Sequence, residues 1–202
     1  MATTLSLTPD LYAVLSGTLN SSALPRILNV FGNASRNNVQ HMHVLFQSTE
    51  GGIREGIRLY DFFKNFSIDL TFYNMDVVSS IAVIPYLGAK TRKVSRHATF
   101  MIRRTETSDQ PMNNDRVAAP GESAVLFDKT AEAILREHIS MPENRWAHFG
   151  HNDLWFSAEQ AVKYGIAQEI GDFAVPADAK IRSILVQSLC LTTSRFVCRN
   201  TD

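Results

Sequence analysis

Hydrophobic and polar positions along the first half of the chain follow two periods, one typical of strands and one typical of helices. Four short apolar runs predict strands: residues 11–17, 41–48, 69–75 and 97–104. Three stretches between them have helical spacing: residues 21–32, which start with two capping serines, 53–66 and 79–89. This alternation predicts parallel βαβ units. The nearly continuous apolar character of the strands predicts that helices cover both faces of the sheet.

The second half of the chain reads differently. Residues 105–120 are polar, contain proline and lack periodicity, which predicts a loop. Residues 122–138 predict a long amphipathic helix, and residues 156–166 predict another. At the start of that last helix, Ser157 and Gln160 have the spacing of a capping box.

The size of the chain favours one domain. Its 202 residues, of which 45% are apolar and 20% charged, have ordinary globular composition. There is no internal repeat and no domain-scale linker. We therefore expect a single domain over residues 1–202, with a core at about 11–171 and a less readable C-terminal tail at 172–202.

Charge and cysteine content narrow the class of partner. The 20 basic and 20 acidic residues balance, which gives no support for a nucleic-acid partner, and we read the basic stretch 90–97 as a solvated hairpin. Cys190 and Cys198 are too few for a disulfide framework. The N-terminus lacks a signal peptide, and no apolar stretch is long enough to cross a membrane. The sequence predicts a cytoplasmic protein without membrane contact.

Two adjacent serines stand out at the start of the helix predicted at 79–89. Ser79 and Ser80 could cap that helix, or one of them could be a nucleophile. The Gly51–Gly52 turn ends the strand before it, and open α/β sheets place their sites at the carboxyl ends of strands. The amides of Gly52 and Ile81 would then form an oxyanion hole beside the serine.

The order of several motifs resembles a known family. The run "STEGG…LYD", followed by "NMDVVSSIAV", "LGAK", "FMIRR" and "FSAEQAVKYGIAQEI", is similar to the Clp protease proteolytic subunit family, within the Clp protease/crotonase-like superfamily. The resemblance covers about residues 11–171. It implies an α/β spiral of βαβ units with a protruding handle-type helix, here 122–138. It also implies peptide hydrolysis by a serine peptidase, with Ser80 in the place of the nucleophile.

The same resemblance leaves the catalytic triad incomplete. It places Arg103 at the position of the family's histidine and Phe149 at the position of its aspartate. Arginine keeps its proton at any working pH, so it cannot act as a general base. We therefore expect weak or absent activity, and the alternative is a non-catalytic oligomeric scaffold or peptide-binding subunit. His148 and His151 flank Phe149 and are candidate substitute bases.

Other chemistries have weaker support. A Ser–Lys dyad would need Lys90 or Lys93 to reach Ser80, and an acyl-CoA-processing crotonase-like enzyme is a remote alternative with no signature beyond the Gly-Gly turn. His41 and His43 have metal-ligand spacing but lack a visible third ligand. We expect no metal and no cofactor.

The resemblance also bears on partners. It implies a peptide or unfolded polypeptide as ligand and a homo-oligomer, which could be a ring. Only about ten residues precede the first predicted strand, whereas the family uses a longer segment, which makes docking of an unfoldase ATPase doubtful. The segment 105–120 lacks the family's glycine-rich strand, which leaves double-ring stacking open.

Overall fold

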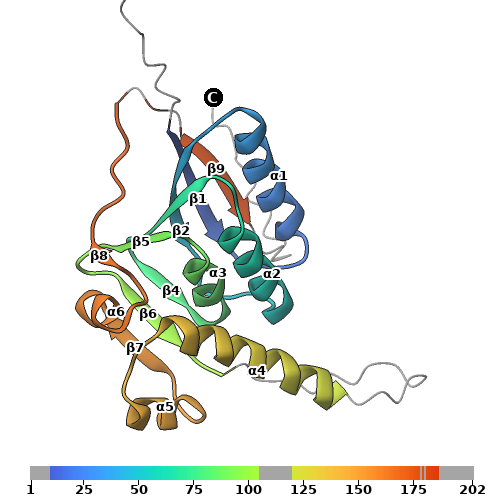
Figure 1. The fold of residues 1–202 in the computed structure, drawn as a ribbon, viewed down its shortest axis with the longest axis vertical. Helices are drawn as coiled ribbons and strands as arrows, with labels where there is room; N and C mark the ends of the chain where they lie inside the picture. Colours follow the sequence, from blue (N-terminus) through green and yellow to red (C-terminus); the bar gives the residue numbers. More distant parts are fainter. Residues whose placement is uncertain (1–9, 105–119, 178, 180, 187–202) are drawn as a thin grey trace, which may run out of the picture.

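The computed structural model describes residues 10–104, 120–177, 179 and 181–186 of the chain. Its main sheet has the order β8-β5-β3-β2-β1-β9, and every pairing in it is parallel (Figure 1). The strands of this sheet are β1 (Leu11–Gly17), β2 (His41–Gln47), β3 (Asp69–Asn74), β5 (Thr91–Val94), β8 (Glu169–Ile170) and β9 (Ile181–Val186).

A smaller sheet stands beside the main one. Its order is β4-β6-β7, with β4 (Val77–Ser79), β6 (Thr99–Ile102) and β7 (Leu154–Ser157). β4 and β6 run parallel, and β6 and β7 run antiparallel. The helices are α1 (Ala23–Arg36), α2 (Ile53–Lys64), α3 (Val83–Leu87), α4 (Pro120–His138), α5 (Glu143–Phe149) and α6 (Ala158–Tyr164). The α/β spiral of βαβ units predicted from the sequence is confirmed.

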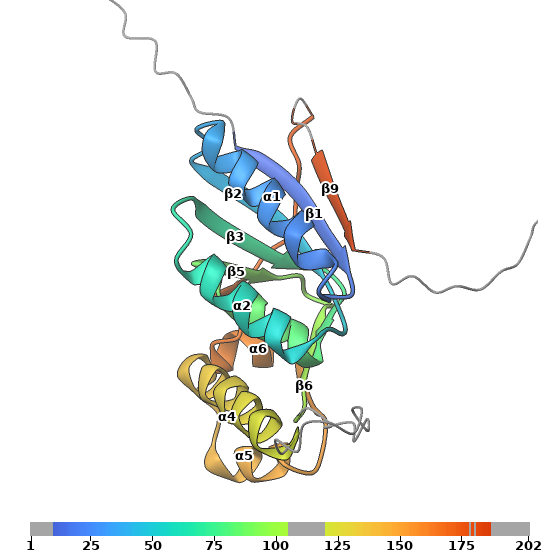
Figure 2. The ribbon, with the colours of Figure 1, turned by 90° about the vertical axis from the view of Figure 1, so that its right-hand side faces the viewer.

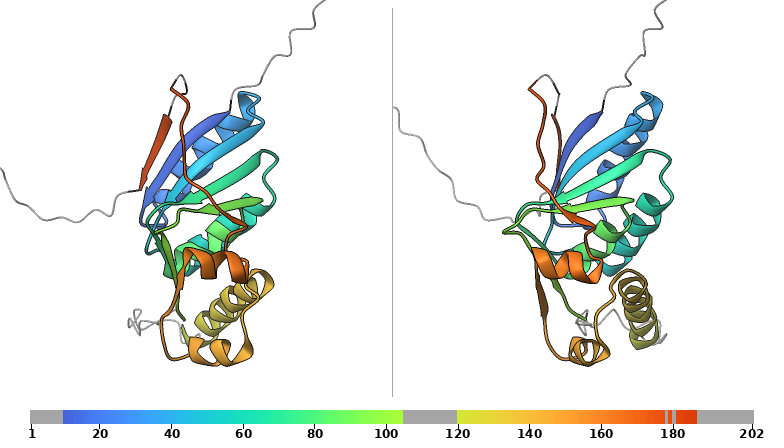
Figure 3. Two further views of the ribbon diagram at one scale, coloured as in Figure 1. Left: turned by 90° about the vertical axis from the view of Figure 1, so that its left-hand side faces the viewer. Right: turned by 60° about the vertical axis from the view of Figure 1, so that its left-hand side comes forward.

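Helices α1 and α2 cover one face of the main sheet only (Figure 2). On the other face, alternate residues of β2 such as His41 and His43 are half-buried, and the chain between β8 and β9 crosses there (Figure 3). Phe173 of that segment packs against Tyr12 and Tyr73, with ring centroids 6.0 and 5.4 Å apart. The prediction that helices cover both faces is therefore wrong for this face, which an extended segment covers.

Several strands lie where the sequence predicted none, namely β4, β5, β7, β8 and β9. Residues 90–97 are not a solvated hairpin, because β5 pairs with β3 inside the main sheet. Arg92 of β5 is only 8% exposed, and its guanidinium donates to backbone carbonyls near the ends of α3 and α6. β9 lies in the predicted tail and pairs with β1.

Helix caps follow the sequence in one place and depart from it in another. The capping box of Ser157 and Gln160 is present at the start of α6. At the start of α1, Ser22 makes no capping hydrogen bond through its side chain. Instead, Asn20 Oδ1 accepts from the amides of Ser22 and Ala23, at 3.1 and 3.0 Å.

Helix α4 extends away from the main sheet, as predicted for a handle-type helix (Figure 1). Its Val125 and Leu126 are exposed, while its last turn packs near α2. The predicted loop at 105–120 falls almost entirely outside the described residues, as do Cys190 and Cys198. No helix in the described part of the chain has both the length and the apolar character needed to cross a membrane.

Candidate active site around Ser80

Ser80 directly follows β4 and is the first residue of a short 3₁₀ segment, Ser80–Ala82, that leads into α3. Its φ of 57° lies in the left-handed region, which non-glycine residues rarely adopt. Such a conformation costs on the order of 1–3 kcal/mol and tends to occur at functional sites. The backbone therefore presents the Ser80 hydroxyl at an apex between strand and helix.

Ser79, by contrast, is a structural residue. It is 5% exposed, its amide donates to Ser48 O at 3.2 Å, and its hydroxyl donates to Thr49 O at 3.0 Å. These bonds tie the turn after β2 to the turn at Ser80. Ser79 makes no capping hydrogen bond through its side chain, so the capping role considered for it is not what the structure shows.

Two glycines allow this close packing. A Cβ on Gly51 would lie 2.7 Å from Leu19 O, and a Cβ on Gly56 would lie 2.7 Å from Ile81 Cγ1. Because real Cβ atoms do not approach neighbours so closely, only glycine fits at either position. The side chain of Ile81 is thereby held between the Gly-Gly turn and α2, which fixes the residue after the serine.

The backbone donors beside Ser80 differ from those expected. The amide of Gly52 already donates to Leu19 O at 2.8 Å, so it is not available to an oxyanion. The Gly51 amide has no hydrogen-bond partner among the residues that the structure describes. Ile81 stands in the first turn of a helical segment, where amides lack partners within the helix. Gly51 and Ile81 are thus the better pair of candidate donors.

Arg103 reaches Ser80 directly. It follows β6, which pairs with β4 in register Ser79 to Met101. Its Nε donates to Ser80 Oγ at 3.3 Å. A guanidinium has only donors, so the serine oxygen is the acceptor in this contact and no group at this position takes the serine proton.

Phe149 closes the same site from the other side. It is the last residue of α5, 5% exposed, and in edge contact with Trp146 at 5.7 Å between ring centroids. With Ser80 and Arg103 it lines a cavity of about 20 Å³. A cavity of this size holds roughly one or two water molecules. The three positions that correspond to a triad in the resemblance are therefore brought together, but Arg103 supplies no base and Phe149 supplies no carboxylate.

Comparison with known proteins places this arrangement in a family. The family model described as Clp protease matches residues 15–173, which is most of the chain and includes all three of these positions. This chain belongs to the Clp protease family.

Curated relatives of this Clp protease family member are distant. ATP-dependent Clp protease proteolytic subunit 2 of Corynebacterium efficiens is 23% identical over 125 residues, which are 61% of this chain and 62% of that protein. Proteolytic subunit 1 of Streptomyces avermitilis is 24% identical over 125 residues, which are 61% of this chain and 57% of that protein. The match spans about three fifths of the length of these relatives.

Solved structures show the shared fold. A mutant ClpP1 of Listeria monocytogenes matches with a TM-score of 0.67 at 15% identity, over 80% of this chain and 91% of that chain. The ClpP protease catalytic domain of Plasmodium falciparum matches with a TM-score of 0.65 at 17% identity, over 82% of this chain and 87% of that chain. The fold class predicted from the sequence agrees with both.

The substitute bases considered for this Clp protease family member do not contact Ser80. His148 and His151 are both exposed, and no hydrogen bond joins either side chain to Ser80 within the described residues. His151 lines a neighbouring cavity of about 250 Å³ together with Arg103 and Phe149, whereas His148 lines neither cavity.

The lysines considered for a Ser–Lys dyad have other partners. Lys90 Nζ is 2.7 Å from Asp69 Oδ1, and Lys93 Nζ is 2.7 Å from Glu169 Oε1. Neither lysine lines the cavity at Ser80. The structure thus gives no dyad.

His41 and His43 stack on each other rather than converge on a metal position. Their ring centroids are 4.4 Å apart. His41 Nε2 is 2.8 Å from Thr71 Oγ1, and His43 Nδ1 is 2.9 Å from Tyr73 OH. In the described part of the chain, no three His, Cys, Asp or Glu side chains gather as a metal site would require.

Three charged residues at the cavity were missed from the sequence. Asp128 and Glu132 of α4 line it, and so does Arg104. Glu132 is engaged by Arg136 at 2.9 Å and lies 3.8 Å from Arg104. Asp128 and Glu132 are four residues apart on a predicted helix, so both carboxylates lie on one helix face. That spacing was the feature of the sequence from which they could have been predicted.

Proposed function

We propose that this chain is a Clp protease family subunit that binds peptide or unfolded polypeptide without hydrolysing it efficiently. The observation that carries the proposal is the contact of Arg103 Nε with Ser80 Oγ. A serine hydroxyl needs an acceptor for its proton during attack, and a permanently charged donor cannot be that acceptor. The small cavity at Ser80 also leaves little room for the acyl group of a substrate.

The peptide ligand is proposed from the family, and the assembly from family and surface together. The curated relatives are proteolytic subunits by name. The exposed Val125 and Leu126 on α4 and the exposed Trp155 on β7 are apolar surfaces of the kind that subunits cover. We propose a homo-oligomer in the cytoplasm, without a nucleic-acid or membrane partner, and we do not invoke an unfoldase ATPase.

A second candidate is a slow serine hydrolase. It is favoured by the left-handed conformation of Ser80 and by the Gly51 amide, which has no partner among the described residues and would be free to donate to an oxyanion. Such a frame alone retains about 10³–10⁴-fold catalysis over water in serine proteases that lack their triad.

A fluorophosphonate probe separates the two candidates. We expect no Ser80-dependent labelling of the wild-type protein between about pH 6 and 9, judged against Ser80→Ala. A double variant, Arg103→His with Phe149→Asp, supplies the missing base and carboxylate, and any folded fraction of it should label. Clear labelling of wild type that Ser80→Ala abolishes would establish the hydrolase instead.

Peptide binding is tested separately by fluorescence anisotropy with a labelled unfolded polypeptide. We expect binding with no cleavage over hours, and equal binding by Ser80→Ala. Absence of binding by the folded oligomer would reject the peptide ligand and leave a scaffold.

A further inference from the structure

Another cavity, larger than the two beside Arg103 and Phe149, lies away from Ser80. It has a volume of about 290 Å³ and shares no lining residue with the cavity at Ser80. It is formed where α2, α3 and α4 end and where β3 and β5 begin. Its larger apolar lining residues are Phe63, Phe66, Ile68, Leu70 and Leu87, and its charged lining is basic except for Asp69.

Arg92 is an unusual member of this lining. Its guanidinium donates to four backbone carbonyls, those of Leu87, Ala89, Gly165 and Ile166, at 2.8 to 3.4 Å. These carbonyls satisfy hydrogen bonds, but they carry no net charge. No carboxylate of the described residues pairs with Arg92. Buried charges are normally paired with an opposite charge. Arg92 departs from this rule, because its partners are neutral carbonyls.

The neighbouring lysines, unlike Arg92, are each paired with a carboxylate. Lys64 Nζ is 2.8 Å from Glu137 Oε1, and Lys90 Nζ is 2.7 Å from Asp69 Oδ1. Each lysine at the cavity thus has its own carboxylate, whereas Arg92 has none in the part of the chain that the structure describes. The lining therefore carries an uncompensated positive charge at its buried end.

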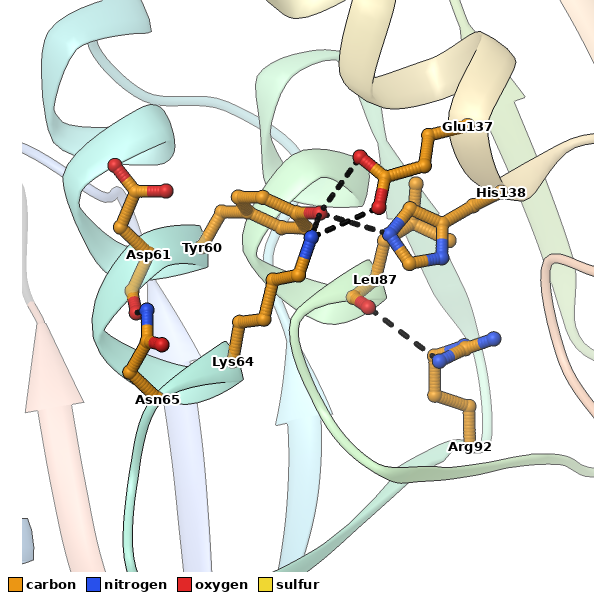
Figure 4. A network of polar contacts seen from close by, with 8 residues as sticks. All are labelled: Tyr60, Asp61, Lys64, Asn65, Leu87, Arg92, Glu137 and His138. Atoms are coloured by element: carbon orange, nitrogen blue, oxygen red, sulfur yellow. Dashed lines mark hydrogen bonds and ion pairs between the residues drawn. The ribbon is translucent and has the colours of Figure 1, made fainter.

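A polar network fixes the basic side of the cavity (Figure 4). Tyr60 OH accepts from Lys64 Nζ at 2.9 Å and lies 2.9 Å from His138 Nε2, to which it can donate. In that arrangement the remaining ring nitrogen of His138 carries the proton and is a donor. His138 lines the cavity together with Arg92.

We propose that this cavity binds an organic monoanion, a carboxylate on an aliphatic or aromatic body. The carboxylate would neutralise Arg92, with Lys90 at the rim, and the body would lie on Phe63, Phe66 and Leu70. The cavity volume of about 290 Å³ lies at the lower end of the range typical of small-molecule pockets, which suits a small ligand such as octanoate. This site is independent of the peptide-binding function proposed above.

Isothermal titration calorimetry on the full chain tests the proposal with sodium octanoate as probe. Octanamide keeps the body without the charge, and acetate keeps the charge without the body. We expect octanoate to bind at least about tenfold more tightly than either, the factor that corresponds to about 1.4 kcal/mol. Equal affinity for octanamide, or no octanoate binding up to about 10 mM, would overturn the proposal.

Variants assign the binding to this cavity. Lys90→Glu reverses a charge on a side chain that is 74% exposed, so folding should survive, and octanoate affinity should fall about tenfold. Lys129→Glu makes the same charge change on the exposed part of α4 outside the cavity and should leave affinity unchanged. Arg92→Met, if circular dichroism shows it folded, should lose binding. Unchanged affinity in Lys90→Glu would exclude this cavity as the site.

Discussion

Ser80 keeps a strained backbone although Arg103, the side chain that contacts its hydroxyl, can only donate a hydrogen bond. Its φ of 57° would be relaxed by glycine. The neighbouring Ser79 is extended, with a φ of −139°, and uses its hydroxyl in a buried hydrogen bond. Of two identical adjacent residues, Ser80 thus has the strained backbone and Ser79 makes the structural hydrogen bonds.

This division predicts opposite effects of one substitution. Ser80→Gly should raise the free energy of unfolding by up to about 1 kcal/mol, because glycine tolerates a positive φ. Ser79→Gly should lower it by about 1–3 kcal/mol, because the carbonyl of Thr49 loses its donor and an extended residue gains freedom. Urea unfolding measures both. A loss in Ser80→Gly as large as in Ser79→Gly would argue against strain at Ser80.

The burial of Phe149 predicts that placing an aspartate at this position will destabilise the fold. Phe149→Asp buries a carboxyl beside Trp146 and removes the aromatic contact, so we expect a loss of about 3–5 kcal/mol in unfolding free energy. Phe149→Leu should lose less, about 1.5 kcal/mol. Chemical denaturation of the two variants checks the difference. Similar small losses in both would mean that the site tolerates a carboxyl group.

Sequence reasoning reached the residues of this site, but not their hydrogen bonds. Motif order was enough to propose Ser80, Arg103 and Phe149, which the fold gathers at one cavity. The choice between the Gly51 and Gly52 amides depends on a bridge to Leu19, far away in the sequence, which no local pattern encodes.

At the scale of elements, predictability depended on how a segment meets its neighbours. The first strands and helices have apolar faces that read directly from periodicity. β5 could not be recognised in this way, because its buried residue Arg92 is charged. The guanidinium of Arg92 donates to backbone carbonyls outside the strand. β9 is an edge strand in the predicted tail, so its place beside β1 comes from tertiary pairing.

The two helix starts predict a contrast between serines that look alike in the sequence. Ser157→Ala removes a capping box and should lower the unfolding free energy by about 1 kcal/mol. Ser22→Ala should be nearly neutral, since Asn20 provides the capping oxygen there. Asn20→Ala should lower the unfolding free energy by about 1 kcal/mol, because it removes that oxygen. Thermal unfolding ranks the three variants, and equal losses for both serines would contradict the assignment.

For the whole molecule, two partly buried histidines predict how stability depends on pH. Burial, and then the charge of Arg92, lower the pKa of His138, while burial and then His41 lower the pKa of His43. Their unfolded pKa values are about 6.5, so below that pH the unfolded chain binds more protons. The stability contributed by both residues is therefore complete above about pH 6.5 and is lost as pH falls through their folded pKa values.

Urea midpoints at pH 7.5 and 5.5 test this. We expect a lower midpoint at pH 5.5, and a smaller pH difference in His138→Gln than in wild type. His148→Gln, a change at an exposed residue, should keep the full difference. If His138→Gln and His148→Gln behave alike, His138 does not carry the effect.

The carbonyl bonds of Arg92 have a consequence for local opening. One side chain on β5 joins the carbonyl ends of α3 and α6, which lie far apart in the chain. Neither short helix can fray at this end without breaking a hydrogen bond to the one side chain that also bonds to the end of the other helix. Amide hydrogens of α3 and α6 should therefore exchange with solvent deuterium as one cooperative unit, although each helix alone would be too short to protect them.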